Sequence, residues 1–116
     1  MIRPRHVVLA AALVAGLAAC GETASTPAPS GNAVTIHNFQ FGPSSLTVAN
    51  GTTVTWTNTD GTAHTTTSDS GDPAGWDSMH LTPNGGTFSF KFTKPGTYGF
   101  HCNIHQYMTG TITVSG

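Results

Sequence analysis

The chain has 116 residues and a formal net charge of −1, and only 8% of its residues are charged. Its length predicts one domain, and its scarcity of Lys and Arg excludes the basic surface that nucleic acid binding requires. The composition is poor in Lys, Glu and Leu and rich in Thr, Val and Phe, which favours strands and excludes a coiled coil or a helical bundle.

Residues 1–19 have the pattern of a secretory signal peptide. Two arginines precede an apolar run at 7–15, which is too short to cross a bilayer as a helix. The run leads to Leu17-Ala18-Ala19-Cys20, which resembles the lipobox of bacterial lipoproteins. That resemblance implies lipidation of Cys20 and anchoring to the outer face of a bacterial membrane, in the periplasm or at the cell surface. The alternative is an ordinary signal peptide followed by an incidental cysteine.

Residues 20–32 are rich in Thr, Ser, Pro, Ala and Gly and lack a periodic apolar face. This composition predicts a disordered tether, so the membrane contact would be made through the N-terminal lipid alone. The folded domain is expected at residues 33–116.

From residue 33 onward, short runs of β-forming residues alternate with turn residues. Asn50-Gly51 is a strong hairpin signal between two of these runs. Alternation places Val54 and Trp56 on one inward face and predicts that Phe88, Phe90 and Phe92 are core residues. Regularly spaced short strands predict a β-sandwich or barrel. The runs are 33–37, 45–49, 52–57, 64–68, 87–93, 97–102 and 110–115.

The chemistry of the chain is concentrated near its C-terminus. If Cys20 is lipidated, Cys102 has no disulfide partner, and it is an inert buried thiol, a nucleophile or a metal ligand. Cys102, His105 and Met108 lie at Cys-x-x-His-x-x-Met spacing on a turn between two predicted strands. Thiolate, imidazole and thioether suit copper, and electron-transfer copper takes two histidines, one cysteine and a weak axial methionine. His64, which follows a turn, is the candidate for the second imidazole.

Most of residues 33–115 resembles the cupredoxin family, in particular its plastocyanin, amicyanin and pseudoazurin branch, and the Cys102–Met108 spacing is most like amicyanin. The resemblance implies an all-β, Greek-key β-sandwich of about eight strands. It also implies one type 1 (blue) copper bound by His64, Cys102, His105 and axial Met108. Besides the ligand loop, the resemblance is carried by the segments at 56–60, 64–68, 85–90 and 95–98.

The resemblance also implies a function. We expect a monomeric electron-transfer protein, not an enzyme, that shuttles single electrons between transient redox donors and acceptors outside the cytoplasmic membrane. A copper chaperone or store is the alternative. An enzyme with Cys102 as nucleophile and His105 as base is disfavoured, because the sequence shows no separate acid to orient the base.

Several further residues bear on this hypothesis. Many family members have Asn where this chain has Thr65, whose hydroxyl can make an equivalent hydrogen bond. Strand alternation directs His101 away from the side chain of Cys102. Met79 and His80 are interpreted as ordinary loop residues. The alternative is that they rim the copper end or bind a second copper weakly.

The sequence also suggests where a partner would dock. We expect electrons to pass through His105, within a small apolar patch formed by Ile104 and Tyr107 with a contribution from Met79. Three acids in one short stretch are interpreted as a solvated loop, with a docking patch for a basic redox partner as the alternative. These acids are Asp69, Asp72 and Asp77.

Overall fold

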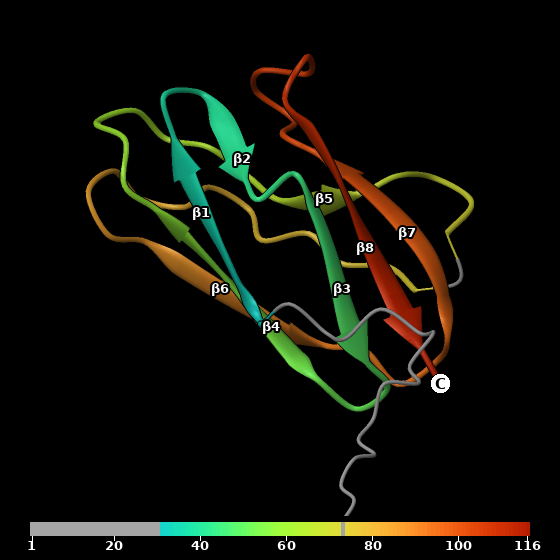
Figure 1. Cartoon of the computed structure of the whole chain (residues 1–116). Helices are drawn as coiled ribbons and strands as arrows, with labels where there is room; N and C mark the ends of the chain where they lie inside the picture. The colour runs from blue at the N-terminus through green and yellow to red at the C-terminus, as the bar shows by residue number, and fades with distance from the viewer. Residues whose placement is uncertain (1–30, 73) are drawn as a thin grey trace, which may run out of the picture.

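The computed structural model describes residues 31–72 and 74–116. The predicted signal peptide, Cys20 and nearly all of the predicted tether lie outside these residues. The described part of the chain forms eight strands in two four-stranded sheets (Figure 1), which confirms the predicted all-β sandwich. Within these residues, no helix has the length and apolar character needed to cross a membrane.

The first sheet has the strand order β2-β1-β4-β6. β1 pairs with β2 in antiparallel and with β4 in parallel orientation, and β4 pairs antiparallel with β6. Register in the last pair sets Val54 opposite Phe90 and Trp56 opposite Phe88. The strands are β1 (Ala33–His37), β2 (Gln40–Gly42), β4 (Thr53–Asn58) and β6 (Thr87–Lys91).

The second sheet has the strand order β3-β8-β7-β5. β8 pairs in parallel with β3 and antiparallel with β7, and β7 pairs antiparallel with β5. Phe100 lies opposite Gly110, where a Cβ atom would come within 2.4 Å of the phenyl Cζ, so this position requires glycine. The strands are β3 (Ser45–Ala49), β5 (Thr67–Ser68), β7 (Gly96–His101) and β8 (Thr109–Ser115).

The core fills the space between the two sheets. Alternate residues of the strands are buried, as the period of two requires. Trp56 is fully buried, and its ring packs against those of Trp76 and Phe100. The three predicted core phenylalanines belong to this cluster: Phe92 is buried, and Phe88 and Phe90 are partly buried against it.

Three connections meet at one end of the sandwich, drawn at the top of Figure 1. They are the β1–β2 turn, the loop that follows β4 and the β7–β8 loop. The C-terminus lies at the opposite end. Segments distant in sequence therefore contribute side chains to a single place.

Three sequence-based expectations were wrong in detail. β2 was not predicted, since three residues that include a glycine give too short a pattern. Asn50-Gly51 does not close a hairpin: Thr52 N–H donates to Ala49 O in a tight turn, but β3 and β4 belong to different sheets. His64 does not open a strand; it forms an isolated bridge with Leu81, and β5 begins only at Thr67.

Candidate metal centre

Cys102 follows directly after β7, and pairing with β8 fixes its orientation. Its backbone N–H donates to Met108 O over 3.1 Å, and Met108 N–H donates to His105 O over 2.9 Å. These bonds close the β7–β8 loop into a compact turn. Strand alternation continues inward at Cys102, which is fully buried, while His101 points to the other face.

His64 is held by the loop after β4, and a buried amide shapes that loop. Asn58 Nδ2 donates to Thr62 O over 2.9 Å and to Leu81 O over 3.1 Å, and its Oδ1 accepts the Asp60 N–H over 3.0 Å. Leu81 N–H donates in turn to His64 O over 2.8 Å. The fully buried Asn58 thus links the end of β4 to both segments of the isolated His64–Leu81 bridge.

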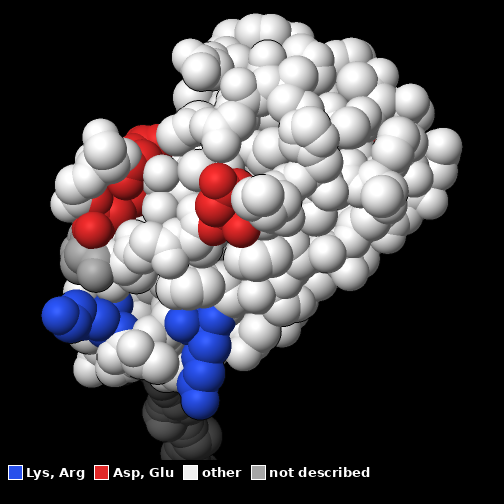
Figure 2. Space-filling model, turned by 180° about the vertical axis from the view of Figure 1, so that it is seen from behind, with Lys and Arg blue, Asp and Glu red and all other residues white. Residues whose placement is uncertain are grey.

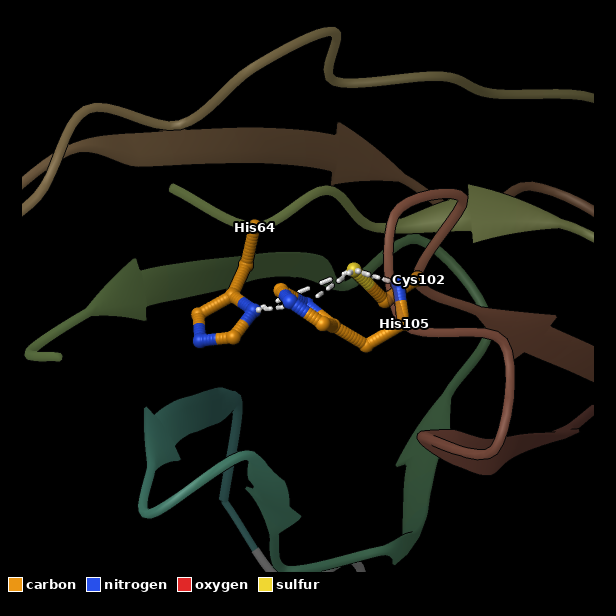
Figure 3. Close-up of side chains that lie close together, drawn as sticks. All are labelled: His64, Cys102 and His105. Carbon is orange, nitrogen blue, oxygen red and sulfur yellow. Dashed lines mark hydrogen bonds between the residues drawn. The ribbon is translucent and has the colours of Figure 1, made fainter. Parts of the chain in front are cut away.

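His64, Cys102 and His105 converge at this end of the sandwich (Figure 3). The Cys102 Sγ lies 3.8 Å from the Nδ1 atom of each histidine, and the two Nδ1 atoms lie 3.2 Å apart. All three donor atoms lie within 4.8 Å of one another. The sequence placed these three side chains at one point, and the structure brings them together.

The spacing of these donors fits one metal ion. Imidazole nitrogen and thiolate sulfur bind a first-row metal such as zinc at about 2.0 to 2.3 Å, so three donors around one ion lie about 3.3 to 3.8 Å apart. Two imidazoles and one thiolate are a donor set that suits copper. Cys102 and His64 are fully buried and His105 partly so, which keeps water from most of the site.

Met108, the predicted axial ligand, is buried at the end of the same loop. Its side chain lines a surface groove together with Phe39, Phe41 and Tyr107. The backbone bonds described above tie it to both Cys102 and His105.

Two backbone N–H groups donate to the Cys102 sulfur, from Thr65 over 3.3 Å and from His105 over 3.5 Å. The Thr65 hydroxyl accepts the Asn103 N–H over 2.8 Å and so links the two ligand loops. The sequence suggested that the Thr65 hydroxyl makes such a hydrogen bond in place of the Asn that many family members have. Hydrogen bonds around the sulfur are one means by which such sites tune their potential.

Asp60 contacts the far side of the His64 ring, with 2.9 Å between Oδ2 and Nε2. Burial opposes ionisation of this carboxyl, but the N–H groups of Phe39 and Asn38 and the His64 ring outweigh it and lower its pKa below the ordinary value. Asp60 was not among the residues predicted to contribute to the site. A carboxylate four residues before a candidate ligand was the available signal.

Phe39 was not predicted to contribute to the site either. Its ring packs edge-on against both His64 and His105, with centroid separations of 5.0 Å in each case. Nothing in the local sequence of the β1–β2 turn indicates this contact, because it depends on how the turn docks against the other two loops.

The other histidines of the described residues lie away from the three donors. His101 Nδ1 lies 2.6 Å from an Asp69 oxygen and its Nε2 lies 2.9 Å from Asn103 Oδ1, which agrees with the expected orientation. The His37 side chain is 69% exposed. Met79 and His80 are exposed and line a shallow hollow beside Thr65 and Asn103, so they rim this end of the molecule.

Apolar side chains are exposed around the site. The exposed large hydrophobic residues of the described chain are Phe39, Met79, Ile104 and Tyr107, and all four come from segments that surround the three donors. Figure 2 shows no charged side chain on the upper part of the face that it presents, with the lysines at the lower end. Exposed apolar side chains therefore border the site, and the upper part of the face in Figure 2 carries no charged side chain.

Comparisons with known proteins agree with this geometry. The family model of the copper-binding proteins of the plastocyanin/azurin family matches residues 30–115. Plastocyanin from Scenedesmus fuscus is 41% identical over 83 residues, which cover 64% of this chain and 85% of that protein. Amicyanin-alpha from Methylorubrum extorquens is 34% identical over 117 residues, which cover 95% of this chain and 98% of that protein.

The fold agrees as well. A mutant of amicyanin in its reduced Cu(I) form at pH 4 superposes with a TM-score of 0.67 and 29% identity, over 72% of this chain and 81% of that chain. Family, donor set and fold lead to one conclusion. The chain belongs to the plastocyanin/azurin family of copper-binding proteins and has the cupredoxin fold.

Proposed function

We propose that this blue-copper protein carries single electrons with one copper ion bound by His64, Cys102, His105 and axial Met108. The observation that carries the proposal is the convergence of two imidazole nitrogens and one buried thiol sulfur within 4.8 Å. When bound, copper supplies a one-electron couple between Cu(I) and Cu(II).

The residues contribute a fixed geometry. His64 is held by the bridge to Leu81, and the other three side chains are held by backbone bonds that close the β7–β8 loop. Because these elements belong to a packed sandwich, the donors would keep nearly the same positions with copper in either oxidation state. A site that needs little rearrangement suits fast electron transfer.

His105 is proposed as the route by which electrons enter and leave. It is the partly exposed member of the three donors, whereas His64 and Cys102 are fully buried. Ile104, Tyr107 and Phe39 expose apolar surface beside it. Such a surface suits a small, transient interface with a redox partner, and we propose that the protein acts as a monomer.

A copper chaperone or store is the alternative function. A chaperone must give up its ion, which favours open sites, whereas here two of the three donors have no exposed surface. Reversible one-electron cycling without loss of copper supports the carrier. Transfer of the ion to a chelator during each cycle would instead support the chaperone.

We also propose that the protein is not an enzyme. Asp60, His64 and Cys102 form a chain of acid, imidazole and thiol, so an orienting acid is present that the sequence did not reveal. The imidazole and the thiol are both fully buried, however, and a substrate cannot reach them. A nucleophilic thiol needs access as well as a base.

Met108 can be tested as the axial ligand by Met108→Leu. The substitution keeps the volume but removes the weak sulfur donor, so the loaded variant should stay coloured and its reduction potential should rise. Equilibrium redox titration measures the change. An unchanged potential would argue against axial ligation by Met108.

The location outside the cytoplasmic membrane, with a lipid on Cys20, is part of the proposal. It rests on the lipobox-like ending of residues 17–20. Cys20→Ala should move the protein from the membrane to the soluble fraction on cell fractionation. Continued membrane association of that variant would refute the anchor without affecting the copper assignment.

A further inference from the structure

We propose that Asp60 is a positioning residue of the copper site, which fixes His64 and the Phe39 turn with one carboxylate and favours the oxidised ion through its charge. The inference rests on the proposed function, since it assigns a role toward the copper ion that the three donors would bind. It concerns a residue that contributes no donor atom itself.

The Asp60 carboxylate accepts three hydrogen bonds from two separate parts of the molecule. Oδ1 accepts the Asn38 N–H over 2.7 Å, and Oδ2 accepts the Phe39 N–H over 2.9 Å. Oδ2 also lies 2.9 Å from His64 Nε2. The backbone around Asp60 is itself fixed, because its N–H donates to Asn58 and its carbonyl accepts from Asn84. The carboxylate is therefore held on both sides and has little freedom to move.

The turn that Asp60 holds has an unusual backbone. Asn38 and Phe39 have φ angles of 55° and 59°, in the left-handed region that a bulky residue such as phenylalanine rarely adopts. Such conformations persist only where surrounding contacts determine them, and they gather at functional sites. Here the determining contacts are the two N–H bonds to Asp60. Their result is that the Phe39 ring packs against both His64 and His105.

The same carboxylate fixes the tautomer and the orientation of the His64 ring. A hydrogen bond from Nε2–H to Asp60 leaves the Nδ1 lone pair directed at the point where Cys102 Sγ and His105 Nδ1 converge. The negative charge of Asp60 lies behind the ring and is screened from water, since its side chain is only 10% exposed. A nearby anion stabilises the more highly charged Cu(II) relative to Cu(I), and so it lowers the potential.

The test compares Asp60→Asn with the matched control Asp77→Asn in the copper-loaded protein. Asp77 also accepts an N–H from a left-handed residue, Met79 at φ 58°, and it contacts Thr67 but none of the three donors. Asp60→Asn should lower the preference for Cu(II) over Cu(I) about tenfold, a rise in potential of about 59 mV for one electron. Asp77→Asn should change the preference for Cu(II) over Cu(I) by less than about twofold. Equal potentials for the two variants would overturn the inference.

Phe39→Leu separates the charge from the turn. It keeps the Asp60–His64 contact and removes only the ring, so its potential should move by less than half of the Asp60→Asn shift. If Phe39→Leu reproduced the whole shift, packing of the turn and not the carboxylate would set the potential, and the inference would be wrong.

A measurement on the unaltered protein covers the case in which Asp60→Asn fails to fold. In the diamagnetic Cu(I) form, NMR should detect His64 Nε2–H as a slowly exchanging proton with the shift of a hydrogen bond to a carboxylate. Rapid exchange of that proton would overturn the inference. If the unaltered protein bound no copper or gave no blue colour, the proposed function would fail instead, so the two failures are distinguishable.

Discussion

The two ends of the sandwich differ in what they bury. At the C-terminal end of β8, the interior is made of apolar side chains such as Val48, Val114 and Phe92. At the copper end, four polar side chains are almost fully buried. They are Asn58, His64, Thr65 and Thr66.

This difference shows how the fold divides its tasks. The apolar end needs only hydrophobic residues of suitable volume at alternate positions, because burial of apolar surface is not directional. The polar end needs a partner for each buried donor and acceptor, because an unpaired polar group in the interior costs about 1 to 3 kcal/mol. One end supplies stability and the other supplies a defined geometry for the ligands.

The largest expected effect is loss of the copper chromophore in Cys102→Ser. Serine has nearly the same volume and fits the buried position, but its hydroxyl cannot replace the thiolate that produces the charge-transfer colour. The loaded variant should lose its intense visible absorption while the circular dichroism of the apo domain stays that of a β-sandwich. Retained blue colour would exclude Cys102 as a ligand.

The next effect should fall on stability alone. Ile112 is fully buried in β8 between the sheets, and Ile112→Ala should lower the free energy of unfolding by about 2 to 5 kcal/mol. Urea denaturation of the apo protein measures the loss. The potential of the loaded variant should stay unchanged, and a shifted potential would show that the apolar core and the copper end are not separate in function.

Asn58→Ala should affect both stability and metal binding. The variant leaves the carbonyls of Thr62 and Leu81 without their amide donor, so the free energy of unfolding should fall by about 1 to 3 kcal/mol. Because the same amide shapes the loop that carries His64, copper affinity should fall as well. Competition with a chelator measures the affinity, and unaltered affinity would separate Asn58 from the site.

The smallest effect should come from an aspartate outside the copper end. Burial, and then the charge of Asp69, raises the pKa of Asp72 above its ordinary value, whereas the partners of Asp60 lower the pKa of that residue. A raised pKa means that Asp72 contributes most stability below its unfolded value of 3.8 and loses that contribution as the pH rises through the folded value.

The variant Asp72→Asn removes this titration. It should be more stable than the unaltered protein at pH 7, by about 0.5 kcal/mol or less, and the difference should vanish near pH 3. Thermal unfolding of the apo protein at several pH values measures this. The stability of Asp72→Asn relative to the unaltered protein should therefore be higher at pH 7 than at pH 3. The opposite order would contradict a raised pKa of Asp72.

The sequence predicted the apolar part of the fold better than the polar end. Alternation located β1 and β3 at their observed bounds and placed Val54 and Trp56 in the core, because period and burial are local properties. The sequence did not show that Asn50-Gly51 connects strands of two different sheets. Turn residues show that the chain reverses but do not show which strands then pair.

The sequence predicted the donors of the candidate site, the Thr65 hydrogen bond and the apolar patch, but not the other residues that position the donors. Cys102, His105 and Met108 share one short loop, and the turn before His64 indicated the second imidazole, which the family resemblance supported. Asp60 lies only four residues before His64. The contacts by which Asn58, Asp60 and Phe39 join the loops, however, connect segments about 20 or more residues apart, and these contacts were missed. No local pattern encodes such contacts; they follow from how three loops pack at one end of the sandwich.

The most direct test of the copper assignment is a combined visible and X-ray absorption measurement on the unaltered protein loaded with one Cu(II) ion. We expect an intense visible thiolate-to-copper band, and a copper ion bound by two imidazole nitrogens and by one sulfur at a short distance. A pale spectrum, with only nitrogen and oxygen around the metal, would show that Cys102 and the two histidines do not bind one ion together.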